Sequence, residues 1–105
     1  MARFDVYRNT GPHAAETPYL LDVQSDLLDG LATRVVIPLR RRHDAPASKT
    51  PENLSPALDI LGEKCTLETP KLAAVPLRIL KNPVASLRES QNTVTAALDF
   101  LFHGF

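Results

Sequence analysis

The stretch LLDVQSDLLDGLATRVVIPL, residues 20–39, decides the fold of this chain. Apolar residues at both ends predict one strand over residues 19–24 and another over 33–39. The second, TRVVIPL, is almost continuously apolar, so we expect it to be buried on both faces or to lie in a dimer contact. Pro38 falls at its end, where a missing N–H is tolerated. The segment DLLDG between the strands predicts a turn that carries two exposed leucines, Leu27 and Leu28.

Short apolar runs separated by turn residues continue the β pattern on either side. RFDVYRN, which begins at residue 3, alternates as a strand does, and TGPHAAETP after it predicts a loop. Residues 40–56 predict a long loop with prolines and charges, and residues 57–69 predict a hairpin that turns at 61–63. Residues 71–75 are compatible with a short helix or a turn, whereas PLRIL, residues 76–80, predicts a last strand.

The chain ends in a clear helical pattern, SLRESQNTVTAALDFLFHGF, residues 86–105. Ser86, with Glu89 three residues later, predicts a capping box at the start, and Gly104 is a natural left-handed stop. Apolar residues recur at three- and four-residue steps and predict one packed face. The members of this face are Leu87, Val94, Leu98, Leu101 and Phe105. The opposite face is polar and contains Gln91, Asn92, Thr95, Asp99 and His103.

The totals predict a single domain, residues 1–105, in which an antiparallel sheet is closed by one C-terminal helix. Twelve basic and twelve acidic residues cancel, so there is no global electrostatic case for binding nucleic acid or an anionic membrane. The lone Cys65 fits a small strand residue and a reducing cytoplasm. Neither a signal peptide nor a membrane span is expected. A small core makes a homo-oligomer a reasonable expectation.

Candidate catalytic or metal-binding groups are sparse. His13 and His43 lack metal-site spacing, and Asp99 with His103 fits a helix-surface ion pair better than catalysis. The run RRRHD, residues 40–44, fits a solvated face better than a phosphate site, and contact with an acidic partner is a third interpretation. From the residues alone we expect no catalytic residue, metal or cofactor, and the chain is typical of a small β-rich interaction module.

One stretch carries more information than this. DVQSD together with VIPL at this spacing is specific, and residues 20–39 strongly resemble the second and third strands of CcdB, the toxin of the ccd toxin–antitoxin module. FDVYRN resembles that family's first strand, and AAVPLRIL, residues 73–80, resembles its ASVPV segment. The final helix matches in its length and its ending. The resemblance covers nearly the whole chain and is loose only at residues 9–18 and 40–56.

The resemblance implies a β-rich (α+β) fold, a twisted antiparallel sheet in an SH3-like barrel of the CcdB, MazF and Kid type with one long C-terminal helix. It implies a two-fold homodimer with these helices near the axis. It also implies a cytoplasmic toxin without catalytic activity that binds the DNA gyrase A subunit and traps the gyrase–DNA cleavage complex. A CcdA-like antitoxin would neutralise it, and the two together would repress their operon, with operator DNA reached only through that complex. No membrane partner is implied.

The family's gyrase-contacting positions carry over onto the DLLDG turn and the end of the helix. They fall on Leu27, Leu28, Gln91, Asp99, Phe102, His103, Gly104 and Phe105. The best-known member of the family has tryptophan at the position of His103, an acidic residue at Gln91 and asparagine at Asp99. A tryptophan pair about a two-fold axis can clamp a partner's arginine, and a neutral histidine stacks less well.

Two other functions remain open. Toxins of the MazF and Kid type share the fold and cleave mRNA, which requires an arginine and an acid or base; His43 beside residues 40–42 is the candidate here. The neutral net charge and the helix ending count against this alternative. The other alternative is a non-toxic family remnant that only binds antitoxin.

Overall fold

The computed structural model describes residues 2–42 and 51–104. Its regular elements are seven strands, one α-helix and several short 3-10 turns. The strands are β1 (Asp5–Arg8), β2 (Tyr19–Asp22), β3 (Thr33–Arg41), β4 (Ala57–Ile60), β5 (Glu63–Leu67), β6 (Ala73–Pro76) and β7 (Ala85–Ser86). The helix is α1 (Gln91–His103), and the 3-10 turns used below are η1 (Asp26–Leu28), η3 (Thr69–Lys71), η4 (Leu77–Ile79) and η5 (Arg88–Ser90).

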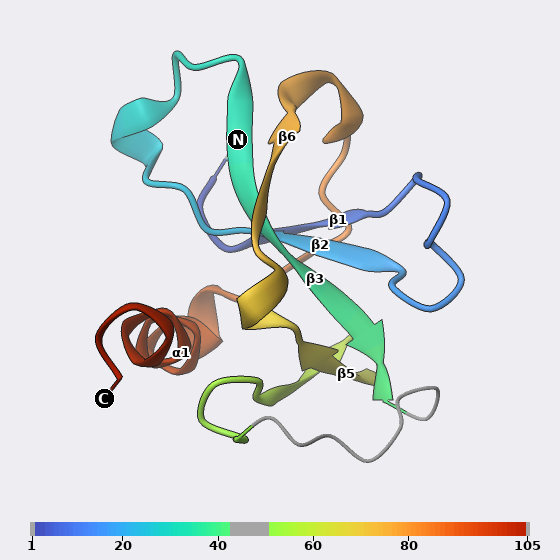
Figure 1. Cartoon of the computed structure of the whole chain (residues 1–105). Helices are drawn as coiled ribbons and strands as arrows, with labels where there is room; N and C mark the ends of the chain where they lie inside the picture. The colour runs from blue at the N-terminus through green and yellow to red at the C-terminus, as the bar shows by residue number, and fades with distance from the viewer. Residues whose placement is uncertain (1, 43–50, 105) are drawn as a thin grey trace.

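The strands form one antiparallel sheet that is nearly closed into a barrel, with α1 packed at one side (Figure 1). Their order is β4-β5-β3-β2-β1-β7, and β6 also pairs with β3. The long strand β3 is the centre of this arrangement, because it pairs with β2, β5 and β6 along its length. The β-rich α+β fold expected from the sequence is confirmed.

The central strands are buried on both faces. Val6, Leu21 and Ile37 lie opposite one another across β1, β2 and β3 and belong to the main core, which includes Val94 and Ala97 of α1. Alternate positions of these strands form a second core cluster on the other face, which consists of Tyr7, Leu20 and Val36 together with Leu80 from the end of η4. Successive side chains of a strand point to opposite faces. A strand that is buried on both faces therefore needs apolar residues at nearly every position. The expectation of two-face burial for TRVVIPL is therefore confirmed.

Strand boundaries differ from the expectation at β2 and β3. β2 ends at Asp22 rather than at residue 24, because the polar residues that follow hold a loop instead of a ladder. β3 continues to Arg41, so Pro38 lies inside the strand rather than at its end. The carbonyl of Pro38 accepts a hydrogen bond from the Glu68 N–H at 2.9 Å. The expectation that the long loop begins at residue 40 is wrong for its first two residues.

The prediction of a last strand over residues 76–80 is also wrong. β6 ends at Pro76, and Leu77–Ile79 forms η4, in which the Leu80 N–H donates to the Leu77 carbonyl at 3.1 Å. Leu80 is buried in the second core cluster, so the apolar alternation there reflects burial rather than an extended backbone. The hairpin over residues 57–69 is confirmed as β4 and β5, joined by Leu61 and Gly62 at φ 53° and 83°.

The helix begins later than the capping box predicts. Ser86 lies in β7 opposite Asp5, and its hydroxyl accepts a hydrogen bond from the Arg88 N–H at 3.3 Å. η5 follows, and α1 starts only at Gln91. The predicted stop at Gly104 is confirmed, because this residue has φ 80° and its N–H donates to the Phe100 carbonyl at 2.9 Å.

Candidate functional site

The loop between β2 and β3 presents two leucines to solvent. Its tip is η1, where the Ser25 hydroxyl accepts a hydrogen bond from the Leu27 N–H at 3.2 Å. Leu27 is 95% exposed and Leu28 is 51% exposed. Burying a leucine side chain is worth about 1.5–3 kcal/mol, so an almost fully exposed leucine at a loop tip is typical of a contact surface. The exposure expected for these two residues is confirmed.

A buried arginine anchors this loop from below. The Arg34 side chain is fully buried in β3, and its Nη2 lies 2.8 Å from Oδ2 of the equally buried Asp22. Its guanidinium also lies 3.5 Å from Asp26 Oδ1 and 3.3 Å from Asp29 Oδ1, both of which are exposed carboxylates of the loop. Nη2 donates further to the Gln24 carbonyl at 3.2 Å. One cation therefore ties the strand to both ends of η1.

Gln24 clamps the same loop with its amide. The Nε2 group donates to the carbonyls of Leu28 at 3.2 Å and Thr33 at 3.3 Å. Its Oε1 accepts a hydrogen bond from the Val35 N–H at 3.0 Å. Gln24 is only 8% exposed, and buried polar groups that are hydrogen-bonded on every side fix a local conformation. The leucines are therefore held out on a braced loop.

Burial and pairing act in opposite directions on the pKa values of Asp22 and Arg34. Burial raises the pKa of the Asp22 carboxyl above its usual range, while hydrogen bonds from Arg34 and from the Gln24 N–H oppose that shift. Burial lowers the pKa of Arg34, but the hydrogen bond and charge of Asp22 raise it by more. Arg34 therefore stays charged, and it is the Asp22 carboxylate that takes up a proton as pH falls.

The end of α1 forms a second exposed surface. Val94 and Ala97 are buried against the sheet, whereas Phe102 is 66% exposed. Phe102 and His103 follow Asp99 by three and four residues, so all three lie on neighbouring positions of one helix side. Gln91, Asp99, His103 and Gly104 are exposed as well. The last predicted site residue, Phe105, lies outside the described residues.

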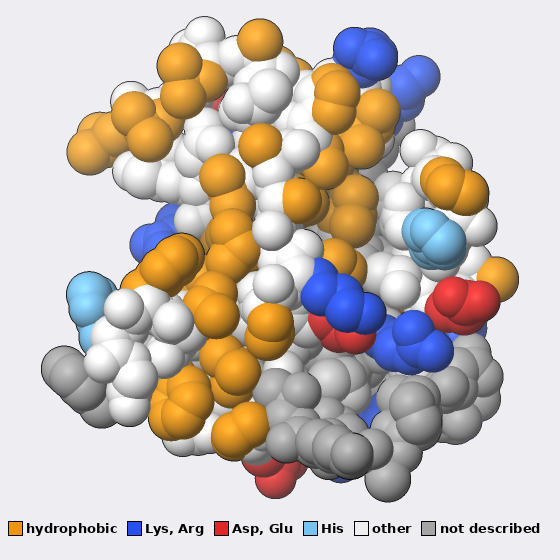
Figure 2. Space-filling model, viewed as in Figure 1, with side chains coloured by type: hydrophobic (Ala, Val, Ile, Leu, Met, Phe, Trp, Pro, Cys, Tyr) orange, Lys and Arg blue, Asp and Glu red, His pale blue; other side chains and the backbone are white. Residues whose placement is uncertain are grey.

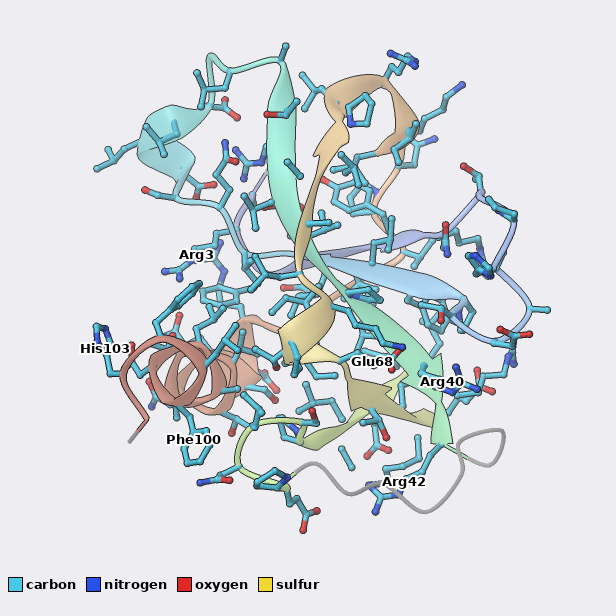
Figure 3. The ribbon with its side chains drawn as sticks, viewed as in Figure 1. Arg3, Arg40, Arg42, Glu68, Phe100 and His103 are labelled. Carbon is cyan, nitrogen blue, oxygen red and sulfur yellow. The ribbon has the colours of Figure 1, made fainter. Side chains whose placement is uncertain are left out.

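The two surfaces remain separate in one copy of the chain. Figure 1 shows η1 at the upper left of the view and α1 at the lower left. Arg3 lies between them (Figure 3), where its N–H donates to Asp26 Oδ1 at 2.8 Å and its Nε donates to the Val23 carbonyl at 2.9 Å. Arg3 therefore joins the N-terminus to the loop, while the helix end stands apart from η1.

Sequence reasoning missed the residues that hold the loop: Arg3, Asp22, Gln24 and Arg34. The available signal was the polar residues Asp22, Gln24 and Arg34 inside otherwise buried strand patterns. A buried charge is retained only when it is paired, so such positions indicate a paired cluster. The spacing alone could not identify which acidic residues Arg34 would meet.

Two of the other candidate groups, Arg41 and Cys65, lie in the sheet. Arg41 lies in β3 and pairs with Glu63 at 2.7 Å, which makes it a structural ion pair. Burial, followed by the charge of Glu63, raises the pKa of the Cys65 thiol to about 11, so the thiolate is disfavoured. His43, the candidate base of the ribonuclease alternative, lies outside the described residues. In the part of the chain that is described, no group of three or more His, Cys, Asp or Glu side chains is placed to hold a metal ion.

Residues 3–104 match the family model of the CcdB protein. This range includes the η1 loop, its buried anchor and α1. No helix among the described residues is long and apolar enough to cross a membrane.

Proposed function

This chain belongs to the CcdB family of toxin–antitoxin toxins, and on that premise we propose that it binds the A subunit of DNA gyrase and traps the gyrase–DNA cleavage complex. The contact surface consists of the η1 loop and the end of α1, residues Leu27, Leu28, Gln91, Asp99, Phe102, His103, Gly104 and Phe105. A CcdA-like antitoxin neutralises the toxin, and the two together repress their operon.

The observation that carries this proposal is Leu27, which is 95% exposed on a loop fixed by the buried Arg34 and Gln24. A braced loop loses little conformational entropy on binding, so most of the free energy of burying the leucine is available as affinity. Removing such an anchor from an interface costs about 1.5–3 kcal/mol. That free energy corresponds to a Kd weaker by roughly one to two orders of magnitude.

The helix end supports the same interpretation. Phe102 offers an aromatic ring to a partner, and aromatic anchors dominate the binding energy of interfaces. Gly104 turns the chain in a left-handed conformation, and a Cβ built there would meet no other atom within 4 Å. A partner's backbone can therefore approach this position closely. In a two-fold dimer, both helix ends would lie side by side as one self-complementary patch.

In this mechanism the protein makes and breaks no covalent bond. It acts by binding more tightly to gyrase in the state in which the DNA is cleaved, and this differential affinity shifts the population toward that state. His103 contributes shape and stacking. Asp99, one helical turn away, offers a carboxylate to a cation of gyrase.

The proposal is tested by mixing purified protein with gyrase, ATP and supercoiled plasmid and measuring the cleaved plasmid after the proteins are denatured. We expect cleaved plasmid with the unmodified chain. His103→Glu, or deletion of residues 104–105, should abolish it while the circular dichroism spectrum remains that of the folded chain. If either variant unfolds, the segment belongs to the core and the surface assignment is wrong. An unchanged plasmid profile at high toxin would favour the non-toxic remnant.

A further inference from the structure

A third surface, which shares no residue with η1 or α1, contains a basic pocket of about 550 Å³. It lies beside η4 and β1, where Figure 2 shows Lys and Arg side chains gathered at the upper right of the view. Its cations are Arg8, Arg78 and Lys81, and none of its lining residues is Asp or Glu. Since basic and acidic residues balance over the whole chain, this segregation gives the pocket a local positive potential.

The cations are not committed to carboxylates. Among the ion pairs of residues 2–42 and 51–104, none involves Arg8, Arg78 or Lys81. Arg8 lies 5.9 Å from the centroid of the Tyr19 ring, which orients its guanidinium without neutralising it. Arg78 and Lys81 are exposed. All three charges are therefore available to an anionic ligand.

The floor of the pocket is apolar and well supported. Tyr7 is 1% exposed and belongs to the second core cluster, against which Ile79 packs. Val84 closes the pocket from the β7 side, and its N–H donates to the Val6 carbonyl at 2.8 Å. Apolar contact therefore lies directly beside positive charge.

We propose that this pocket binds an acidic peptide segment of a partner protein, with a carboxylate at Arg78 and Lys81 and a neighbouring apolar side chain against Tyr7, Ile79 and Val84. Arginine recognises carboxylates through paired, charge-assisted hydrogen bonds. Duplex DNA fits less well, because a phosphate backbone requires a broad basic surface and makes no use of an apolar floor. The proposal is independent of gyrase binding, since the pocket contains no residue of the η1 loop or α1.

The test measures the fluorescence polarisation of a labelled peptide of alternating glutamate and leucine, titrated with the full chain at low salt. The variant is Arg78→Glu with Lys81→Glu, two exposed positions of the pocket. The matched control is Lys64→Glu with Arg88→Glu, which changes the net charge equally at two exposed positions outside the pocket. We expect the pocket variant to raise Kd by about tenfold or more and the control to leave it within about twofold.

A peptide of alternating glutamate and serine should bind more weakly than the leucine peptide, because it cannot use the apolar floor. The proposal is overturned if both double variants weaken binding equally, since the effect is then one of net charge. It is also overturned if the chain binds neither peptide, or if a short DNA duplex binds more tightly and loses that affinity in the pocket variant.

Discussion

Replacing the buried arginine under the η1 loop tests the structural account most severely. Arg34→Met keeps much of the side-chain volume but leaves the buried Asp22 carboxylate without its cation at 2.8 Å. Breaking one side of a buried ion pair costs about 3–5 kcal/mol. The contacts to the exposed Asp26 and Asp29 carboxylates add below about 1 kcal/mol each. We therefore expect a loss of about 4 kcal/mol, which is a large fraction of the roughly 5–15 kcal/mol typical of a domain of this size.

The assay is equilibrium urea unfolding at one fixed protein concentration, because any dimer would make the midpoint depend on concentration. A loss of this size lowers the midpoint by roughly 2 M for an ordinary urea slope. Asp26→Asn and Asp29→Asn are the controls, and each should lose below about 1 kcal/mol. Adding Asp22→Asn to Arg34→Met should recover about half of the loss, because the stranded charge is removed. If Arg34→Met loses below about 1 kcal/mol, the loop is held by something other than this pair.

The pH dependence of Arg34→Met gives a second readout of the same pair. Burial already raises the pKa of Asp22 in the unmodified chain, and loss of Arg34 removes the hydrogen bond and charge that most oppose this shift, while the hydrogen bond from the Gln24 N–H remains. A carboxyl whose folded pKa is raised above its unfolded value stabilises the fold below the unfolded pKa, and this contribution is lost as pH rises through the folded pKa. The deficit of Arg34→Met should therefore shrink as the pH is lowered. A deficit independent of pH would contradict the role assigned to Asp22.

Three further predictions concern the core, the helix end and the cysteine. Val94→Ala removes a fully buried contact between α1 and the sheet and should cost about 2 kcal/mol in the same unfolding assay; a loss below about 0.5 kcal/mol would show that α1 is not part of the core. Gly104→Ala places a Cβ at φ 80° and should cost about 1 kcal/mol locally, seen as faster hydrogen exchange of the residue 104 N–H; unchanged exchange would contradict the left-handed cap. Burial raises the folded pKa of Cys65 to about 11, so its contribution to stability is present at neutral pH. That contribution is lost as pH rises from about 9 to 11, by up to about 1.4 kcal/mol per pH unit. Cys65→Ala should lack this part of the dependence of the unfolding free energy on pH, and an equal dependence in both chains would contradict the raised pKa.

The sequence predicted the fold well where the apolar pattern was strong. The nearly continuous apolar run of β3 indicated burial on both faces, and two core clusters sharing this strand are observed. The pattern failed at Ser86, because a serine followed by a glutamate satisfies a capping box as well as it satisfies a short strand and a 3-10 turn. It failed at residues 76–80 because apolar alternation also arises where a turn directs side chains into a core.

The candidate site was predictable in its exposed residues but not in what supports them. Leu27 and Leu28 stand in a turn signal, so their exposure follows from local sequence. The clamp formed by Gln24 and Arg34 depends on partners up to twelve residues away, and only the register of β2 and β3 brings those partners together. That register is a tertiary property that local patterns do not contain.

The measurement that tests the central claim most directly is the toxin concentration that gives half-maximal cleaved plasmid with purified gyrase. Leu27→Ser removes the 95% exposed leucine of η1, and Leu61→Ser removes a 59% exposed leucine of the β4–β5 turn as the matched control. We expect Leu27→Ser to raise that concentration by about tenfold or more and Leu61→Ser to leave it unchanged within about twofold. Equal effects of the two substitutions, or no cleaved plasmid with the unmodified chain, would contradict the account.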